Sequence, residues 1–201
     1  MMFRELPAFI LGNGPTLPVA ELPLLAGQLT VGVNRILRSG FVPTAIMWLD
    51  QGVADEEGPQ LESSGALLLG PRMHAVRGMA PLDYVGGYKA WDEPSNPWTI
   101  RPNGNMGVAA ARWAQSLGCF PVYLLGMSAK GQLDFYGTNP HHSGDTPDVM
   151  RRELDRLLSG GNAVPVADGV ELQRIVSGLS MQYDQDAMRR ELRGMIERRG
   201  Q

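Results

Sequence analysis

The sequence predicts an α/β protein: a single Rossmann-like, doubly wound, mainly parallel sheet with helices on both faces. Short apolar runs of strand length alternate along the chain with segments of helical spacing, which is typical of an open parallel sheet. Glycine or a short polar residue follows several of these runs, as at Gly12, Asn34 and Asp50. Because ligands bind at the carboxyl ends of parallel strands, these positions predict a binding site.

The composition indicates one globular domain. The chain has 201 residues, of which 43% are hydrophobic and 19% are charged, and this is enough to bury a sizeable core. A net charge of -3 excludes a general attraction of the whole surface to nucleic acid. A single cysteine, Cys119 in an apolar context, excludes an internal disulfide and favours a buried thiol and a cytoplasmic protein. No apolar stretch is long enough to span a membrane.

The first strand and the turn after it predict a ligand cradle. The apolar run 8–11 leads into Gly12, Asn13, Gly14, Pro15 and Thr16, and a short helix is expected over 18–26. Glycines let a backbone approach a ligand closely, and the N–H groups at a helix start attract anions. The turn is therefore interpreted as a phosphate or nucleotide site; the alternative is a tight strand-to-helix turn with no ligand.

Further elements follow in order along the chain. Strands are expected at 29–33, 45–49, 66–69, 122–125 and 163–166, and helices at 105–117, 148–158 and 182–199. The strand at 163–166 is expected at the periphery because it contains Pro165. Asn13, Asn34 and Asp50 would all emerge at one edge of the sheet; the alternative is that each starts a turn or caps a helix.

The segment 79–104 breaks the alternation, because it holds several prolines and aromatic residues without a clear period. It is interpreted as a lid or an acceptor-binding loop within a single domain spanning 1–180, followed by a C-terminal helix at 181–201. That helix mixes both charge signs, which is typical of a solvated face. A grip on an anionic acceptor by Arg189, Arg190 and Arg198 is the second interpretation.

Several of these motifs together resemble a known superfamily. The segments 12–17, 32–35, 105–107 and 123–127 occur in an order similar to that of the Campylobacter-type bacterial sialyltransferases. They also resemble a related group that includes hydroxymethylpterin pyrophosphokinases and phage-encoded proteins, and the similarity extends from about residue 9 to 168. Both branches bind a nucleotide-activated donor. The resemblance implies donor-binding roles for Gly12, Asn13, Gly14, Pro15, Thr16, Asn34, Asp50, Asn105, Met106, Gly107, Gly126, Met127 and Ser128.

Three positions depart from the pattern of the sialyltransferases. Met106 stands where relatives have a small hydroxyl residue, so the side-chain hydrogen bond that the resemblance implies there is not expected, whereas backbone N–H donation from Gly107 is still possible. Asp50 stands where the sialyltransferases carry asparagine and the phage-type relatives carry aspartate. Ser128 replaces an aspartate of the relatives, which weakens the case for a metal in that loop.

Two adjacent histidines, His141 and His142, lie in a polar loop between Asp134 and Asp145. Histidine exchanges protons near neutral pH, and the resemblance implies that one of the two is the general base acting on the acceptor hydroxyl. His141 matches the base, and His142 matches a tyrosine that touches the donor phosphate; the two roles could be exchanged. The alternatives are a metal site with Asp134 or Asp145, and a solvated loop.

The resemblance therefore implies a transferase, and most closely a sialyltransferase-like glycosyltransferase that needs no cofactor. The alternatives are an ATP-dependent pyrophosphokinase, in which Asp50 would hold Mg²⁺, and a catalytically silent nucleotide-binding module. The acceptor could be a small molecule, a glycan or modified DNA. The sequence also leaves open a homo-oligomer.

Overall fold

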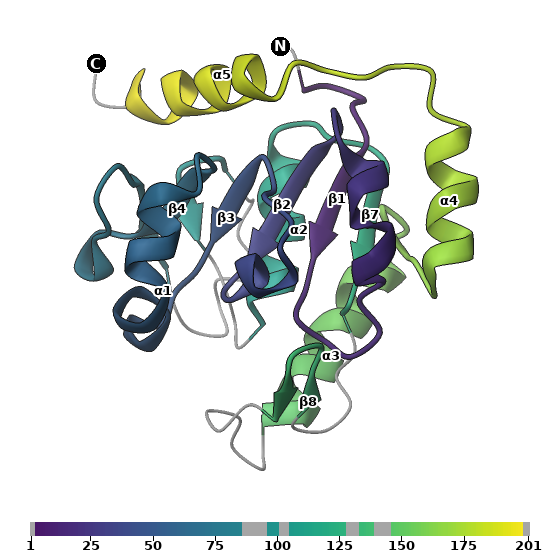
Figure 1. Cartoon of the computed structure of the whole chain (residues 1–201), viewed down its shortest axis with the longest axis horizontal. Helices are drawn as coiled ribbons and strands as arrows, with labels where there is room; N and C mark the ends of the chain where they lie inside the picture. Colours follow the sequence, from purple (N-terminus) through teal and green to yellow (C-terminus); the bar gives the residue numbers. More distant parts are fainter. Residues whose placement is uncertain (1–2, 86–95, 101–104, 128–132, 139–145, 199–201) are drawn as a thin grey trace.

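The computed structural model describes residues 3–85, 96–100, 105–127, 133–138 and 146–198. Its strands, in chain order, are β1 (Ala8–Leu11), β2 (Leu29–Val33), β3 (Ala45–Met47), β4 (Leu67–Pro71), β5 (Ala80–Tyr84), β6 (Thr99–Ile100), β7 (Val122–Leu125), β8 (Leu133–Asp134), β9 (Gly137–Thr138) and β10 (Ala163–Pro165). Eight of them form one parallel sheet in the order β10-β7-β1-β2-β3-β4-β5-β6 (Figure 1). The antiparallel pair β8–β9 is separate. The predicted fold class is thus confirmed.

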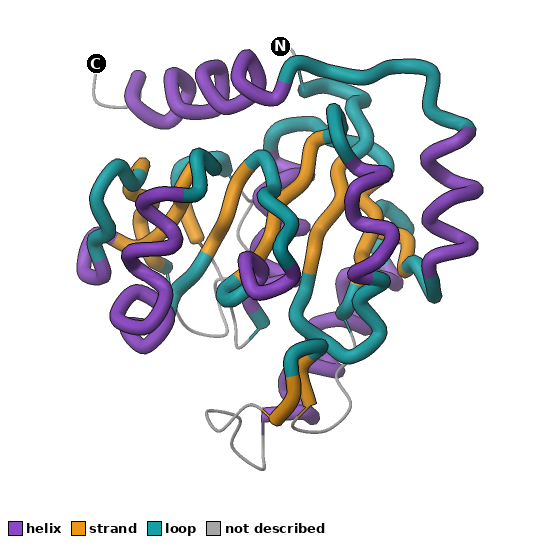
Figure 2. Tube along the Cα trace, viewed as in Figure 1, coloured by secondary structure: helices purple, strands orange, loops and turns teal. Residues whose placement is uncertain are grey.

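Helices cover both faces of the sheet, as Figure 2 shows by the helical segments in front of and behind the strands. One face packs against α2 (Met106–Ser116) and α3 (Thr146–Ser159), and buried side chains of α5 (Gln185–Glu197) join the same core. The other packs against α1 (Gln51–Ser63), α4 (Gly169–Ser177) and the 3₁₀ helices η1 (Val19–Leu25) and η2 (Ile36–Ser39). A third 3₁₀ helix, η3 (Arg72–His74), follows β4.

Strand β1 shows why the central strands are apolar throughout. Ala8 and Ile10 belong to the core on the α2 side, and Phe9 and Leu11 belong to the core on the η1 side. All four are fully buried. A strand with a hydrophobic layer on each face leaves no position for a polar side chain, which is why its sequence identifies it.

The first expected helix is a 3₁₀ helix. Pro18 stands at its N-cap and Pro23 lies inside it, and a proline lacks the N–H that an α-helix needs in its interior. Helices α1 and α4 were not predicted. Helix α1 contains Gly52, Gly58 and Pro59, which lower its helix propensity, so tertiary packing has to supply its stability.

The segment expected as a lid, 79–104, requires a correction. Residues 80–84 form β5 and residues 99–100 form β6, so both extend the parallel sheet at its far edge. Residues 86–95 and 101–104 lie outside the described part of the chain. The strand at the opposite edge, β10, agrees with the peripheral strand that Pro165 predicts.

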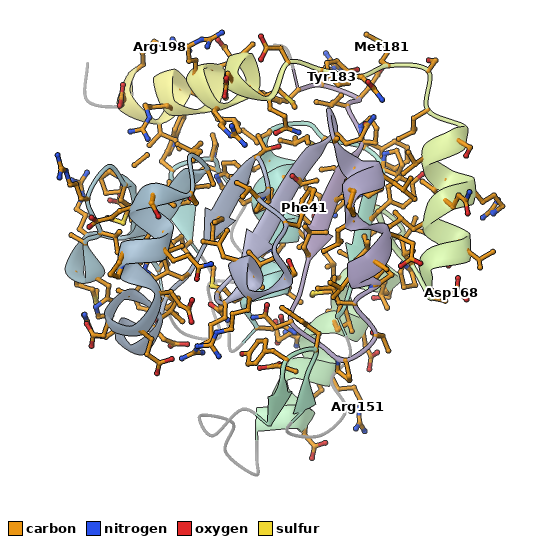
Figure 3. All side chains as sticks on the ribbon, in the orientation of Figure 1. Phe41, Arg151, Asp168, Met181, Tyr183 and Arg198 are labelled. Carbon is orange, nitrogen blue, oxygen red and sulfur yellow. The ribbon has the colours of Figure 1, made fainter. Side chains whose placement is uncertain are left out.

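Helix α5 lies across the amino ends of the strands (Figures 1 and 3). Gln185 donates from Nε2 to the Gln28 carbonyl at 2.7 Å and accepts from Thr44 Oγ1 at 2.6 Å. Just before the helix, the Tyr183 N–H donates to the Gly27 carbonyl at 2.7 Å. Arg189 pairs with Asp186 at 2.9 Å and points its Nε at the Thr44 carbonyl, so this arginine holds the helix to the sheet.

Cys119 is buried, as its apolar context predicts, with 4% of its surface exposed. Burial raises the pKa of its thiol to about 12, which keeps the group in its unreactive protonated form at neutral pH. Within the described ranges, no helix combines the length and the apolar character that crossing a membrane requires.

We expect Gln185→Ala to lower the free energy of unfolding by about 1–3 kcal/mol, because it leaves the buried Thr44 hydroxyl and the Gln28 carbonyl without these partners. Urea denaturation followed by circular dichroism measures the change. Gln173→Ala, at an exposed position of α4, is the control and should change it by less than about 0.5 kcal/mol. Equal effects of the two substitutions would show that this contact does not hold α5.

Candidate functional site

The order of strands places a switch point between β1 and β7. From β1 the sheet grows through β2 to β6 in one direction, and the chain then returns to add β7 and β10 on the other side of β1. In doubly wound sheets the ligand crevice lies at the carboxyl ends of the two strands at such a point. The residues that follow β1 and β7 are Gly12 to Gly14 and Gly126 to Met127, all of which the sequence predicts as site residues.

The turns after β1 and β7 are bonded to each other. The Gly12 N–H donates to the Leu125 carbonyl at 2.8 Å, and the Gly14 N–H donates to the Gly126 carbonyl at 2.8 Å. A Cβ on Gly12 would lie 2.5 Å from the Gly126 carbonyl oxygen, so the close approach at this glycine is made by the protein's own backbone. These two N–H groups therefore bond to the protein's own backbone and are not the donors of a phosphate site.

Pro15 and Thr16 are exposed and lie in a turn. The helix η1 begins only at Val19, so no helix N-terminus directly follows the glycine turn. The expected anion site therefore lacks the helix start that the sequence predicts directly behind the turn, and it stays a prediction.

Met127 fills the space between the β1 turn and the start of α2. A Cβ placed on Gly12 would lie 2.9 Å from the Met127 sulfur, and one placed on Gly107 would collide with the Met127 sulfur and methyl group. Asn105 caps α2, because its Oδ1 accepts from the Val108 N–H at 3.1 Å, and its neighbour Met106 packs against the core. The predicted residues of the β1 turn, of the turn after β7 and of the start of α2 thus lie together. Close packing explains why glycine is needed at positions 12 and 107.

Asn13 and Asn34 carry the most unusual feature of the site. The Oδ1 atoms of both residues are buried and have no hydrogen-bond partner in the part of the chain that the structure describes. The Asn13 carbonyl accepts from Phe135 N–H at 2.7 Å, and the Asn34 N–H donates to the Met47 carbonyl at 3.0 Å, so both backbones are fixed. Asn34 has φ +50°, which suits asparagine. Buried acceptors without a donor are rare in folded proteins and are expected to meet a water or a ligand.

Asp50 occupies the N-cap position of α1 at the carboxyl end of β3. Its backbone carbonyl accepts from the Val53 N–H at 3.1 Å, but its carboxylate makes no capping bond and is exposed. Asp50 therefore caps α1 by its position and its backbone bond, but its side chain does not act as a cap. The described residues contain no group of three or more histidine, cysteine or acidic side chains arranged to bind a metal.

A cluster of charged side chains borders the crevice beside Asn34. Arg35 donates from Nε and Nη2 to Glu56 Oε2, at 3.0 and 2.8 Å, and Arg38 donates from Nε to Glu57 Oε1 at 2.8 Å. Arg35 and Glu57 are buried. Burial lowers the pKa of Arg35, but the hydrogen bond and charge of Glu56 outweigh it and raise the pKa above its ordinary value.

The hairpin β8–β9 lies beyond the carboxyl ends of the central strands (Figure 1). The Arg38 guanidinium lies 4.8 Å from the centre of the Tyr136 ring, and the Tyr136 hydroxyl donates to Asp134 Oδ2 at 2.6 Å. Burial and the hydrogen bond to Asp134 raise the pKa of Tyr136, so its hydroxyl stays protonated at neutral pH.

Sequence reasoning did not single out Tyr136, Arg38 or the glutamates of α1. The signal in the sequence was a pair of arginines three residues apart, Arg35 and Arg38, followed by the adjacent acidic residues 56 and 57, which could have indicated the ion pairs. His141, His142 and Ser128 lie outside the described residues.

No protein-family model, no curated protein and no solved structure matches the chain. The likeness to the sialyltransferases and pyrophosphokinases therefore stays a prediction that rests on the motifs of the sequence.

We expect Gly12→Ala to destabilise the protein more than Gly107→Ala. A methyl group on Gly12 meets the Gly126 carbonyl, which cannot move without shifting β7, whereas a methyl on Gly107 meets only the flexible end of Met127. The first should cost about 1–3 kcal/mol of unfolding free energy, measured by urea denaturation.

Met127→Ala is the matched second substitution. In a protein that already carries Met127→Ala, Gly107→Ala should cost little unfolding free energy, because the side chain that its methyl group meets is gone. Gly12→Ala should remain costly in that background, because the contact with the Gly126 carbonyl remains. Full recovery in the Gly12 pair would contradict the backbone contact as the cause.

Proposed function

We propose that this protein is a transferase that binds a nucleotide-activated donor at the carboxyl ends of β1, β2 and β7. The reaction we favour is sialyltransferase-like transfer of a sugar to an acceptor hydroxyl. The observation that carries the proposal is a pair of buried oxygens, on Asn13 and Asn34, that have no hydrogen-bond partner among the described residues and follow two neighbouring strands beside the switch point.

These oxygens indicate what the ligand must offer. A buried acceptor without a donor costs about 1–3 kcal/mol, and a ligand that supplies a hydroxyl or N–H recovers that loss on binding. The ribose of a nucleotide carries hydroxyl donors, and the asparagine of the glycine turn is the residue that the resemblance assigns to the ribose and phosphate. A nucleoside is therefore the ligand that agrees with both arguments.

The phosphate of the donor needs a different partner from the glycine N–H groups. The N–H groups of Gly12 and Gly14 already bond to the turn after β7, so in this proposal the phosphate binds at the start of α2. Met127 packs against Gly107 at this start, and in this proposal its side chain moves aside when the phosphate binds. A methionine side chain is flexible enough for such a movement.

The chemistry requires a base. In the proposed step a histidine takes the proton of the acceptor hydroxyl while that oxygen bonds to the anomeric carbon of the sugar. The bond from that carbon to the donor phosphate breaks, and the nucleotide leaves with the electron pair. The resemblance assigns the base to His141, with His142 as its alternative.

A pyrophosphokinase is the second candidate, and the observation that favours it is the exposed Asp50 carboxylate at the carboxyl end of β3. Such a carboxylate can hold Mg²⁺ together with the phosphates of ATP. The two candidates therefore differ in their nucleotide and in their need for a metal.

Calorimetric titration with CMP, UDP and ATP, each with and without Mg²⁺, tests the site. We expect a cytidine or uridine nucleotide to bind without metal, and Asn13→Ala and Asn34→Gly each to weaken binding about tenfold by deleting one acceptor. Glycine is chosen at position 34 because it tolerates the positive φ. Gln60→Ala, at an exposed position on α1, is the control and should leave the affinity unchanged.

Binding of ATP alone, with an absolute need for Mg²⁺ and a loss in Asp50→Asn, would establish the pyrophosphokinase instead. Absence of binding by every nucleotide at millimolar concentration would overturn both candidates.

Replacement of the base should abolish turnover but not binding. We expect His141→Ala, or His142→Ala if the roles are exchanged, to slow release of CMP from a CMP-sugar donor by about 10²–10⁴-fold with nucleotide affinity kept. Release of CMP is followed by chromatography, and His74→Ala, a histidine on η3, is the control. Equal turnover in all three variants, with nucleotide binding retained, would leave a silent nucleotide-binding module.

A further inference from the structure

A cavity lies between α2 and α3, on the face of the sheet that these helices cover. Its volume is about 230 Å³, and its lining consists of Arg112, Gln115, Arg156, Leu157, Gly160 and Asn162. These residues come from the second half of α2, the end of α3 and the turn that leads into β10.

This cavity is separate from the crevice at the switch point. The Asn162 carbonyl accepts from the N–H of Val122, the first residue of β7, so the turn before β10 lies at the amino ends of the strands. The candidate nucleotide site lies at the opposite, carboxyl ends. The two sites therefore lie at opposite ends of the strands.

Two guanidinium groups dominate the chemistry of the lining. Arg112 is the one charged residue in the sequence of α2, and it is 9% exposed although the residues around it are small or apolar. Arg156 faces the same cavity from α3, and the cavity lining includes no carboxylate. Arg156 also pairs with the buried Glu153, whose Oε1 lies 3.6 Å from Arg156 Nη1 and which is not among the lining residues.

The remaining polar groups of the lining suit an oxyanion as well. Gln115 and Asn162 each carry an amide that can donate two hydrogen bonds, and Gly160 puts no side chain into the opening. Arginine forks match the oxygens of a phosphoryl group with paired hydrogen bonds, and such charge-assisted bonds are stronger than neutral ones.

We propose that this cavity binds the phosphoryl group of a small phosphorylated molecule, held between the Arg112 and Arg156 guanidinium groups. The volume accommodates a phosphate with a small organic group attached. The proposal does not rest on the nucleotide site at the carboxyl ends of the strands, because it uses other residues, which lie at the amino ends.

Isothermal titration of the full chain with inorganic phosphate, and with acetate for comparison, tests the site at low ionic strength. We expect phosphate to bind at least about tenfold more tightly than acetate, and Arg156→Gln to weaken phosphate binding about tenfold. Arg151→Gln is the matched control, since Arg151 is an exposed arginine on the first half of the same helix (Figure 3) and does not line the cavity. It should change the affinity less than twofold.

A second variant, Asn162→Asp, keeps the test informative without touching the buried Arg112. It places a carboxylate at an exposed position of the lining, and we expect it to weaken phosphate binding at least as much as Arg156→Gln. Unchanged melting temperatures show that both variants are folded.

Three results would overturn the proposal. They are the absence of phosphate binding at millimolar concentration, equal losses in Arg156→Gln and Arg151→Gln, and acetate binding as tight as phosphate. Asn34→Gly separates this site from the nucleotide site, because it should leave phosphate binding intact. Phosphate binding that is lost in Asn34→Gly and kept in Arg156→Gln would assign the anion to the crevice instead.

Discussion

The pairing of β7 with β1 is the interaction on which the candidate site depends. It brings the turn after residue 125 against the turn after residue 11, and the N–H groups of Gly12 and Gly14 donate to the carbonyls of Leu125 and Gly126. Strand β7 is separated from β1 in sequence by the whole β2–β6 half of the sheet. The crevice thus exists only because the chain returns to the first strand.

This pairing changes the role of the glycines. A glycine at position 12 is needed because the Gly126 carbonyl leaves no room for a Cβ, and Gly107 gives room to the Met127 side chain. The N–H groups of Gly12 and Gly14 are bonded to the chain itself, whereas the buried Oδ1 atoms of Asn13 and Asn34 have no hydrogen-bond partner among the described residues. A motif that resembles a backbone cradle is, at these two N–H groups, part of the contact between the ends of β1 and β7.

The wall of the crevice beside Asn34 is built from segments that are far apart in sequence. Arg38 of η2 pairs with Glu57 of α1 and lies over the ring of Tyr136, about a hundred residues further on. Phe135 of the same hairpin donates its N–H to the Asn13 carbonyl. The hairpin is therefore in contact with residues that follow two neighbouring strands, β1 and β2.

The sequence by itself determined the central strands, the edge position of β10 and the polar residues at the strand ends. It could do so because a strand buried on both faces must be apolar throughout, because Pro165 cannot complete a central ladder, and because a change to polar residues marks where the strand leaves the core. The weak helix α1 and the two-residue strand β6 could not be predicted in this way, since packing and not local propensity stabilises them. The tertiary structure alone decided which polar groups of the site are already satisfied. The partners of Gly12, Asn13 and Gly14 come from β7 and the β8 hairpin, and hydrogen bonds across such distances leave no pattern in the sequence.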